Sequence, residues 1–254
     1  MPENHISGKM NLEQRLRQVV ARVHAAELQY GREIASVHIL PVSKTRSAEE
    51  MAAVAELGIA ELGQAFGENY LQEALDKIAA LADRDLQWHF IGPIQSNKTA
   101  QIAQHFHWVH SVDRLKIAQR LNDQRPAELP PLNVCLQVNV SGEASKSGIA
   151  LDELPALAEQ VALLPRLRLR GLMAIPAASE DPVAQRAAFH AVHKAFNLLK
   201  NPQHAKGIQG NWQYWDTLSM GMSGDLEMAI AEGATIVRVG TDIFGPRLPP
   251  SKEK

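Results

Sequence analysis

The sequence predicts an α/β protein built as a single (β/α)8 barrel of the TIM type. Eight short apolar runs alternate with helical patterns along nearly the whole chain, and no long series of strands stands alone. The length of 254 residues is one that single barrels commonly occupy. An open, doubly wound sheet is the alternative, and it is disfavoured because no Gly-x-Gly-x-x-Gly turn follows the first strand.

The first element is expected to be a helix over residues 11–30. Its apolar residues recur at helical spacing, and Asn11 can act as the N-cap. The alternation then begins with a strand at 37–44 and a helix at 48–57, for which Ser47 is the expected cap. The other predicted strands are 61–66, 87–92, 108–112, 133–140, 167–175, 215–220 and 235–239, and the other predicted helices are 69–81, 98–104, 114–125, 151–164, 183–199 and 226–232.

The bulk composition excludes several classes of function. Charged residues make up 21% of the chain and the formal net charge is -2, so the basic excess expected of a nucleic-acid-binding protein is absent. No leader is evident, and no stretch approaches the roughly 18 apolar residues of a membrane span. The single cysteine, Cys135, lies in an apolar run and reads as a small core residue. We therefore expect a cytoplasmic protein with no nucleic-acid or membrane partner.

The chain divides into three parts. Residues 1–10 are polar and are expected to be a disordered lead-in, 11–247 form the barrel, and 248–254 are a short tail. We expect a monomer or a weak dimer. Within the barrel, an active site should lie at the carboxyl ends of the strands, where phosphates often bind after strands seven and eight.

Lys44 ends the first apolar run, where that strand would meet the active-site face. An isolated strand-end lysine is usually only solvated. Here an apolar surrounding and a nearby arginine could lower its pKa through desolvation and like-charge repulsion, as a Schiff-base lysine requires. Lys44 is therefore the candidate nucleophilic amine.

Small residues and hydroxyls follow the last two predicted strands. The segment from Ser223 through Gly224 to Asp225 opens a helix, so its backbone N–H groups would attract a phosphate, and an ordinary capped helix is the alternative. Further candidates are Ser219, Gly221, Gly240 and Thr241. With Lys44, these groups suggest a site for pyridoxal 5'-phosphate (PLP).

Arg238 stands between two valines of the last strand, so it faces either the barrel mouth or a buried carboxylate. If it meets the pyridine nitrogen of PLP, it can only donate a hydrogen bond there. The ring then becomes a poor electron sink, which disfavours aminotransferase and decarboxylase chemistry.

Other polar residues carry weaker signals. Asn69 and His89 could pack near a cofactor ring, or could be satisfied polar residues at strand ends, and Met173 lies on the sixth strand. His105, His107 and His110 resemble metal ligands, but their strand spacing separates them and no cysteine or carboxylate pair completes a site. They are interpreted as surface and strand-end histidines, and no metal is predicted.

With these residues placed, the chain resembles the PLP homeostasis protein family, whose barrel is like the N-terminal domain of alanine racemases. The resemblance runs from residue 11 to residue 247 and is carried by five short stretches: Pro41–Thr45, Phe66–Asn69, Trp88–Gly92 with Gln95–Lys98, Ser219–Ser223 and Arg238–Thr241. It implies a fold-type III PLP barrel without the second β domain, with the aldimine lysine on Lys44 and the pyridine-nitrogen arginine on Arg238. It also implies phosphate contacts from Ser219, Ser223, Gly224, Gly240 and Thr241.

The resemblance further implies a role in intracellular PLP (vitamin B6) homeostasis without robust turnover, with apo PLP-dependent enzymes as possible recipients. The residues independently offer no evident second acid/base, since only Tyr70 of the three tyrosines falls near the mouth. A single-domain amino-acid racemase is the alternative. A further hypothesis gives Lys146, in the Gly- and Ser-rich loop after strand five, a part in handing on PLP, against the alternative of a solvated loop lysine.

Overall fold

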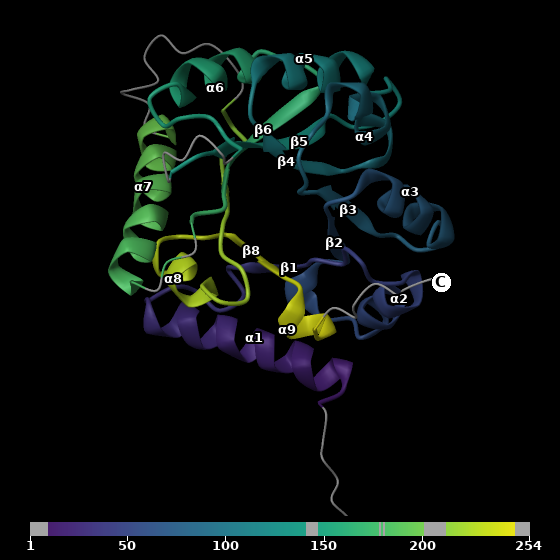
Figure 1. The fold of residues 1–254 in the computed structure, drawn as a ribbon, viewed down its shortest axis with the longest axis vertical. Helices are drawn as coiled ribbons and strands as arrows, with labels where there is room; N and C mark the ends of the chain where they lie inside the picture. Colours follow the sequence, from purple (N-terminus) through teal and green to yellow (C-terminus); the bar gives the residue numbers. More distant parts are fainter. Residues whose placement is uncertain (1–9, 141–146, 178, 180, 201–211, 247–254) are drawn as a thin grey trace, which may run out of the picture.

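The computed structural model describes residues 10–140, 147–177, 179, 181–200 and 212–246 of the chain. Within them, eight parallel strands form one sheet in the order β1-β8-β7-β6-β5-β4-β3-β2. The first and last members of this order meet through a single bridge between Val42 and Gly67, which closes the sheet into a barrel. Figure 1 shows the helices outside the ring of strands. The predicted single (β/α)8 barrel is confirmed.

The strands are short, as the apolar runs indicated. They are β1 (His38–Pro41), β2 (Ala65–Glu68), β3 (Gln87–Phe90), β4 (Trp108–Val112), β5 (Leu132–Val138), β6 (Leu167–Ala174), β7 (Thr217–Ser219) and β8 (Ile236–Val239). Residues alternate between the two faces of each strand, so Val109 and Val237 pack in the main core towards the helices while Trp108 and Arg238 face the barrel interior.

The helices are α1 (Leu12–Gln29), α2 (Ala48–Glu56), α3 (Leu71–Ala80), α4 (Thr99–His105), α5 (Leu115–Gln124), α6 (Leu154–Ala162), α7 (Pro182–Lys200), α8 (Leu226–Ala231) and α9 (Thr241–Phe244). Capping boxes begin α1 at Asn11 and α2 at Ser47, as their sequences predicted. In the described residues, no helix has the length and apolar character needed to cross a bilayer.

Two element predictions were wrong. The second strand was predicted at 61–66, but residues Ala60–Leu62 form a 3-10 helix and β2 begins only at Ala65. Gly63 and Gln64 between them have φ values of 54° and 56°, a left-handed turn that redirects the chain before the strand. The short helix α9 was not predicted, because four residues carry too little periodicity to reveal a helix.

Helix α1 precedes the first strand and lies on the outside of the barrel beside α8 and α9 (Figure 1). Its buried Glu27 fixes the entry into β1, because its carboxylate accepts hydrogen bonds from the backbone N–H groups of Ala35 at 3.0 Å and Val37 at 2.8 Å. These bonds hold Ala35 in a left-handed conformation, with φ 61°. A buried carboxylate therefore sets where the first strand starts.

The interior of the barrel holds a chain of polar side chains as well as apolar ones. His89 on β3 and His110 on β4 are buried and joined by a 2.9 Å contact between Nδ1 of His89 and Nε2 of His110. The Nδ1 atom of His110 lies 2.7 Å from Oγ of Ser219, which accepts a hydrogen bond from Arg238 at 2.9 Å. We call His89, His110, Ser219 and Arg238 the interior chain.

Arg238 is the positive end of the interior chain, and its bond to Ser219 is the starting point for assigning the protons of Ser219, His110 and His89. Arg238 can only donate, and Nδ1 of His110 is the acceptor that the described residues offer the Ser219 hydroxyl, so we assign the Ser219 proton to that bond. Burial lowers the pKa of His110 from 6.5 to about 3, with the Arg238 charge as a further cause, so the ring is neutral and carries its proton on Nε2. Its Nε2–H then donates to Nδ1 of His89. Burial also holds the pKa of His89 well below its ordinary value, so we assign the His89 proton to Nε2.

These positions correct the interpretation of His110 as a surface or strand-end histidine. His105 and His107 are exposed, in agreement with that interpretation. His110, in contrast, is fully buried. The difference follows from strand alternation, which turns residues 108 and 110 inward together.

We predict that the buried His110 makes the protein less stable as the pH falls below 6.5. A histidine with a depressed pKa takes up its proton more readily in the unfolded chain, so protonation favours unfolding between pH 6.5 and about 3. Between pH 7.5 and 5.5 His110 should contribute about 1.4 kcal/mol to the loss of unfolding free energy. Urea denaturation at the two pH values should show a smaller loss for His110→Asn than for the wild type.

The exposed His105→Asn variant is the control and should lose as much stability as the wild type. Equal pH dependence in all three proteins would contradict a neutral, buried His110.

Candidate functional site

Lys44 is half-buried at the carboxyl end of the barrel, three residues beyond the end of β1. The chain leading to it is fixed on both sides, because Val42 N donates to the carbonyl of Val239 at 2.9 Å and Ser43 N donates to that of Gly67 at 3.0 Å. Thr45 follows with φ 64°, and its N–H donates to Oε1 of Glu73 at 2.5 Å. Lys44 thus stands on a turn held by β8, β2 and α3.

A buried ion pair lies directly under this turn. Oε1 of Glu68, at the end of β2, accepts from the Ser43 hydroxyl at 2.7 Å and from Nζ of Lys77 at 2.7 Å. Lys77 also donates to the Ser43 carbonyl at 2.7 Å. Burial raises the pKa of the Glu68 carboxyl, an effect that Lys77 opposes. Lys77 also pairs with Glu73 at 2.5 Å, so loss of Lys77 would leave the buried Glu68 carboxylate uncompensated, whereas loss of Glu68 would leave Lys77 paired with Glu73.

Sequence reasoning missed the roles of Glu68, Lys77 and Ser43. Glu68 was noted only as part of a motif, although a carboxylate at the end of a buried strand needs a cationic partner. A lysine on the apolar side of the next helix was the available signal for Lys77.

Arg238 lies inside the barrel near the ends of β6, β7 and β8. Its guanidinium donates to the carbonyls of Ser219 at 2.6 Å and Ala174 at 2.9 Å, and to the Ser219 hydroxyl. Burial lowers its pKa to about 10, so it remains protonated at neutral pH. The prediction left open whether Arg238 meets a buried carboxylate, and its described partners are carbonyl and hydroxyl oxygens. No carboxylate is hydrogen-bonded to Arg238 in the described residues, although the charge of Asp225 acts on it from nearby.

Two backbone segments lie beside this arginine after β7 and β8. Among the described residues, the backbone N–H groups of Ser223, Gly224, Gly240 and Thr241 find no acceptor. A Cβ on Gly240 would lie 3.3 Å from the Val42 carbonyl, so the glycine allows the two chains to approach closely. Backbone N–H groups without acceptors suit an anion such as a phosphate.

The helix after β7 begins at Leu226, as predicted, and ends one residue earlier than predicted. It has only six residues, so the free N–H groups of the turn contribute more than a helix dipole. Asp225 shapes the turn, because its carboxylate accepts from the Met222 N–H at 2.5 Å. Burial raises the pKa of this carboxyl.

The remaining predicted residues divide by depth. Asn69 lines a cavity of about 270 Å³ at the mouth with Ile91, Pro93, Gln137, Ser147 and Ile175, and its Oδ1 is buried without a partner in the described structure. Ser219 is fully buried, and its hydroxyl is engaged by His110 and Arg238. Met173 packs with Trp108 and Cys135 inside the barrel, and His89 lies beside them.

The predicted site residues therefore lie at three levels of the barrel. Lys44, Asn69, Ser223, Gly224, Gly240 and Thr241 lie at the mouth, Arg238 and Ser219 beneath it, and Met173 and His89 within the barrel. Cys135 is buried, and burial raises the pKa of its thiol to about 12, as befits a core residue. Lys146 lies outside the described residues, as do residues 1–9 and 247–254.

Comparisons with known proteins show the family of the chain. The family described as "Alanine racemase, N-terminal domain" matches residues 21–248. The Pyridoxal phosphate homeostasis protein of Pseudomonas aeruginosa is 62% identical over 229 residues, which cover 90% of this chain and 93% of that protein. The protein of the same name from Escherichia coli strain K12 is 51% identical over 235 residues, covering 91% and 95%.

A solved structure of PipY from Synechococcus elongatus, with PLP bound, superposes with a TM-score of 0.71 at 35% identity. The match covers 90% of this chain and the whole of that one. An entire barrel is thus shared, with no segment of PipY left unmatched. From the family match and these identities, the chain belongs to the pyridoxal phosphate homeostasis proteins, within the wider group of alanine racemase N-terminal domains.

Proposed function

We propose that this protein binds PLP at the carboxyl end of its barrel and holds it as a Schiff base on Lys44. The observation that carries the proposal is the protonated Arg238, buried beneath a mouth where a half-buried lysine and acceptor-free N–H groups lie together. PipY, at 35% identity, is described with PLP bound. Condensation of the lysine amine with the aldehyde would form one C=N bond and release one water.

Each part of the cofactor has residues of suitable chemistry. The N–H groups of Ser223, Gly224, Gly240 and Thr241 would hold the phosphate. Arg238 would donate to the pyridine nitrogen. The buried Oδ1 of Asn69 can accept from a polar group of the ring, which would satisfy it. In this arrangement Ser219 orients Arg238, and Met173 is part of the apolar floor.

The state of Arg238 favours a carrier over a catalyst. PLP is the stronger electron sink when its ring nitrogen carries a proton. With a pKa of about 10, Arg238 keeps its own proton at neutral pH and would only donate a hydrogen bond to that nitrogen. This arrangement disfavours aminotransferase and decarboxylase chemistry.

The proposed role is PLP homeostasis, with apo PLP-dependent enzymes as the class of recipient. A racemase would need a second proton carrier opposite Lys44. Tyr30 and Tyr214 lie at the amino end of the barrel, before β1 and β7, and Tyr70 is 53% exposed at the start of α3. An exposed phenol is poorly placed to exchange protons with a ligand held over Arg238.

We predict that Lys44→Ala abolishes the near-visible absorbance of the PLP-loaded protein without loss of fold. Lys44 is only half-buried and lies beyond the strand, so it contributes little to the core. Absorption spectra and circular dichroism measure the two properties. Lys98→Ala, which removes an exposed lysine after β3, is the matched control and should keep the absorbance. Retained absorbance in the Lys44 variant would place the cofactor on another amine.

We predict that Arg238→Ala weakens PLP retention by about 1–3 kcal/mol, the range for losing a charge-assisted hydrogen bond. Dialysis of the loaded protein followed by measurement of bound PLP gives the dissociation constant. Arg170→Ala removes a different interior-facing arginine, one paired with Asp216, and should leave retention unchanged. Equal retention in all proteins would make Arg238 purely structural.

We predict that racemisation and decarboxylation of amino acids proceed no faster than with free PLP and an unrelated lysine-bearing protein. The second acid/base has no evident candidate, and the ring is a weak electron sink. Chiral chromatography of a panel of amino acids measures the racemisation. Sustained turnover at about 1 per second or more would instead favour the single-domain racemase.

A further inference from the structure

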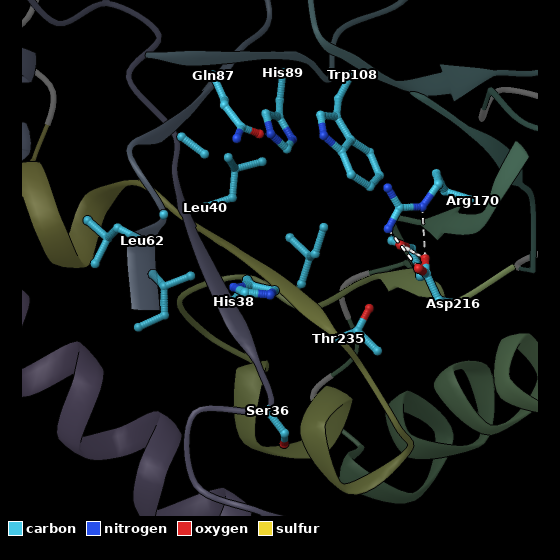
Figure 2. Close-up of a pocket in the computed structure, with 15 residues that line it drawn as sticks. Ser36, His38, Leu40, Leu62, Gln87, His89, Trp108, Arg170, Asp216 and Thr235 are labelled. Carbon is cyan, nitrogen blue, oxygen red and sulfur yellow. Dashed lines mark hydrogen bonds and ion pairs between the residues drawn. The ribbon is translucent and has the colours of Figure 1, made fainter. Parts of the chain in front are cut away.

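A second cavity opens at the amino end of the barrel, opposite Lys44 (Figure 2). Its volume is about 440 Å³, within the range of small-molecule sites. The walls come from the beginnings of seven strands or the turns before them, and Leu40, Ala65 and Ile236 supply apolar surface. PLP bound over Arg238 would not occupy this space, because the interior chain lies between the two ends.

His89 brings an unpaired polar atom to this cavity. The side chain lines the cavity, and the residue is only 5% exposed. Its Nδ1 is taken by His110, whereas its Nε2 is buried and has no partner in the described part of the chain. The proton order of the interior chain makes this Nε2 a donor. A buried donor without an acceptor costs about 1–3 kcal/mol, so an acceptor placed there would be stabilised.

The charges of the cavity do not favour an anion. Among the described lining residues, Arg170 is the arginine present, and it donates to both carboxylate oxygens of Asp216 at 2.9 and 2.7 Å. Figure 2 shows this pair at one side of the cavity. The guanidinium also donates to Asn133 and lies 4.4 Å from the centre of the Trp108 ring. Its charge is therefore neutralised within the wall.

Aromatic surface adjoins the free donor. The rings of His89 and Trp108 are stacked, with centroids 5.2 Å apart and planes 9° from parallel. Figure 2 shows both rings on the same side of the cavity, facing the space bounded by Leu40 and His38. A flat ligand can contact this surface and present an acceptor to Nε2 at the same time.

We propose that the amino-end cavity binds a small, uncharged ring compound whose nitrogen or carbonyl oxygen accepts the hydrogen bond of His89 Nε2. Phosphorylated compounds are excluded from this class, because the cavity offers their charge no unpaired cation. The ligand would add the final acceptor to the interior chain. It would thus be linked to Arg238 through four hydrogen bonds that all run in one direction, the fourth being the one from His89 Nε2 to the ligand.

The test uses 3-methylpyridine and toluene, two probes of nearly equal shape of which only the first has an acceptor nitrogen. The full chain is titrated with each at pH 7.5, where the pyridine is unprotonated, and the indole N–H resonance of Trp108 is followed by NMR. Trp108→Phe assigns that resonance. We expect saturable binding of 3-methylpyridine and at least tenfold weaker binding of toluene.

Two variants locate the site. Ala65→Leu fills the apolar wall and should weaken 3-methylpyridine binding at least tenfold, whereas Ala53→Leu, on the exposed surface of α2, should not. His89→Phe should remove the preference for 3-methylpyridine over toluene. Failure of 3-methylpyridine to bind, equal binding of the two probes to the wild type, or unchanged binding in Ala65→Leu would overturn the proposal. None of these outcomes depends on PLP, so the proposed function stands or falls separately.

Discussion

The burial of one positive charge, that of Arg238, organises the interior of this barrel. A guanidinium removed from water is tolerated only when its donors are satisfied, and here two strand carbonyls and the Ser219 hydroxyl do so. In the assigned proton order, Ser219 donates to His110, and His110 donates to His89. One charge at the end of β8 thereby fixes the hydrogen bonding of side chains on three other strands.

A second buried charge pair stabilises the other side of the mouth. Glu68 and Lys77 join β2 to α3 and hold the Ser43 side chain and carbonyl next to Lys44. The two arrangements differ in kind. Arg238 donates to neutral oxygens, whereas Lys77 meets the carboxylates of Glu68 and Glu73. The first can therefore act on a ligand, and the second positions a residue.

Much of the fold could be predicted because a barrel repeats one local pattern. Apolar runs marked the strands, and alternation correctly turned Arg238 away from its two neighbouring valines. The boundaries of β2 were predicted wrongly, because a left-handed turn at Gly63 and Gln64 separates residues 60–62 from the strand that follows. The local sequence did not indicate that residues 61–64 lie outside the sheet.

Sequence reasoning proposed site residues only where their position relative to a strand end gave a reason. Lys44 and Arg238 follow from strand ends, and the glycines from close approach of the chain. The partner of His110 could not be predicted, because Ser219 lies 109 residues further along the chain. The Glu68–Lys77 pair similarly needs the packing of α3 against the end of β2, and His89 belongs to the amino-end cavity as much as to the cofactor side.

The closure of the sheet bears on how Lys44 is held. The strand order joins seven neighbouring pairs, of which β7 and β8 share a single register pair, and β1 and β2 meet through the bridge of Val42 and Gly67. Lys44 lies two residues after this bridge, next to the hydrogen bond from the Ser43 N–H to the Gly67 carbonyl. The lysine proposed to hold PLP thus follows the seam at which the barrel closes, and the contacts of Ser43 with Glu68 and Lys77 hold that seam together.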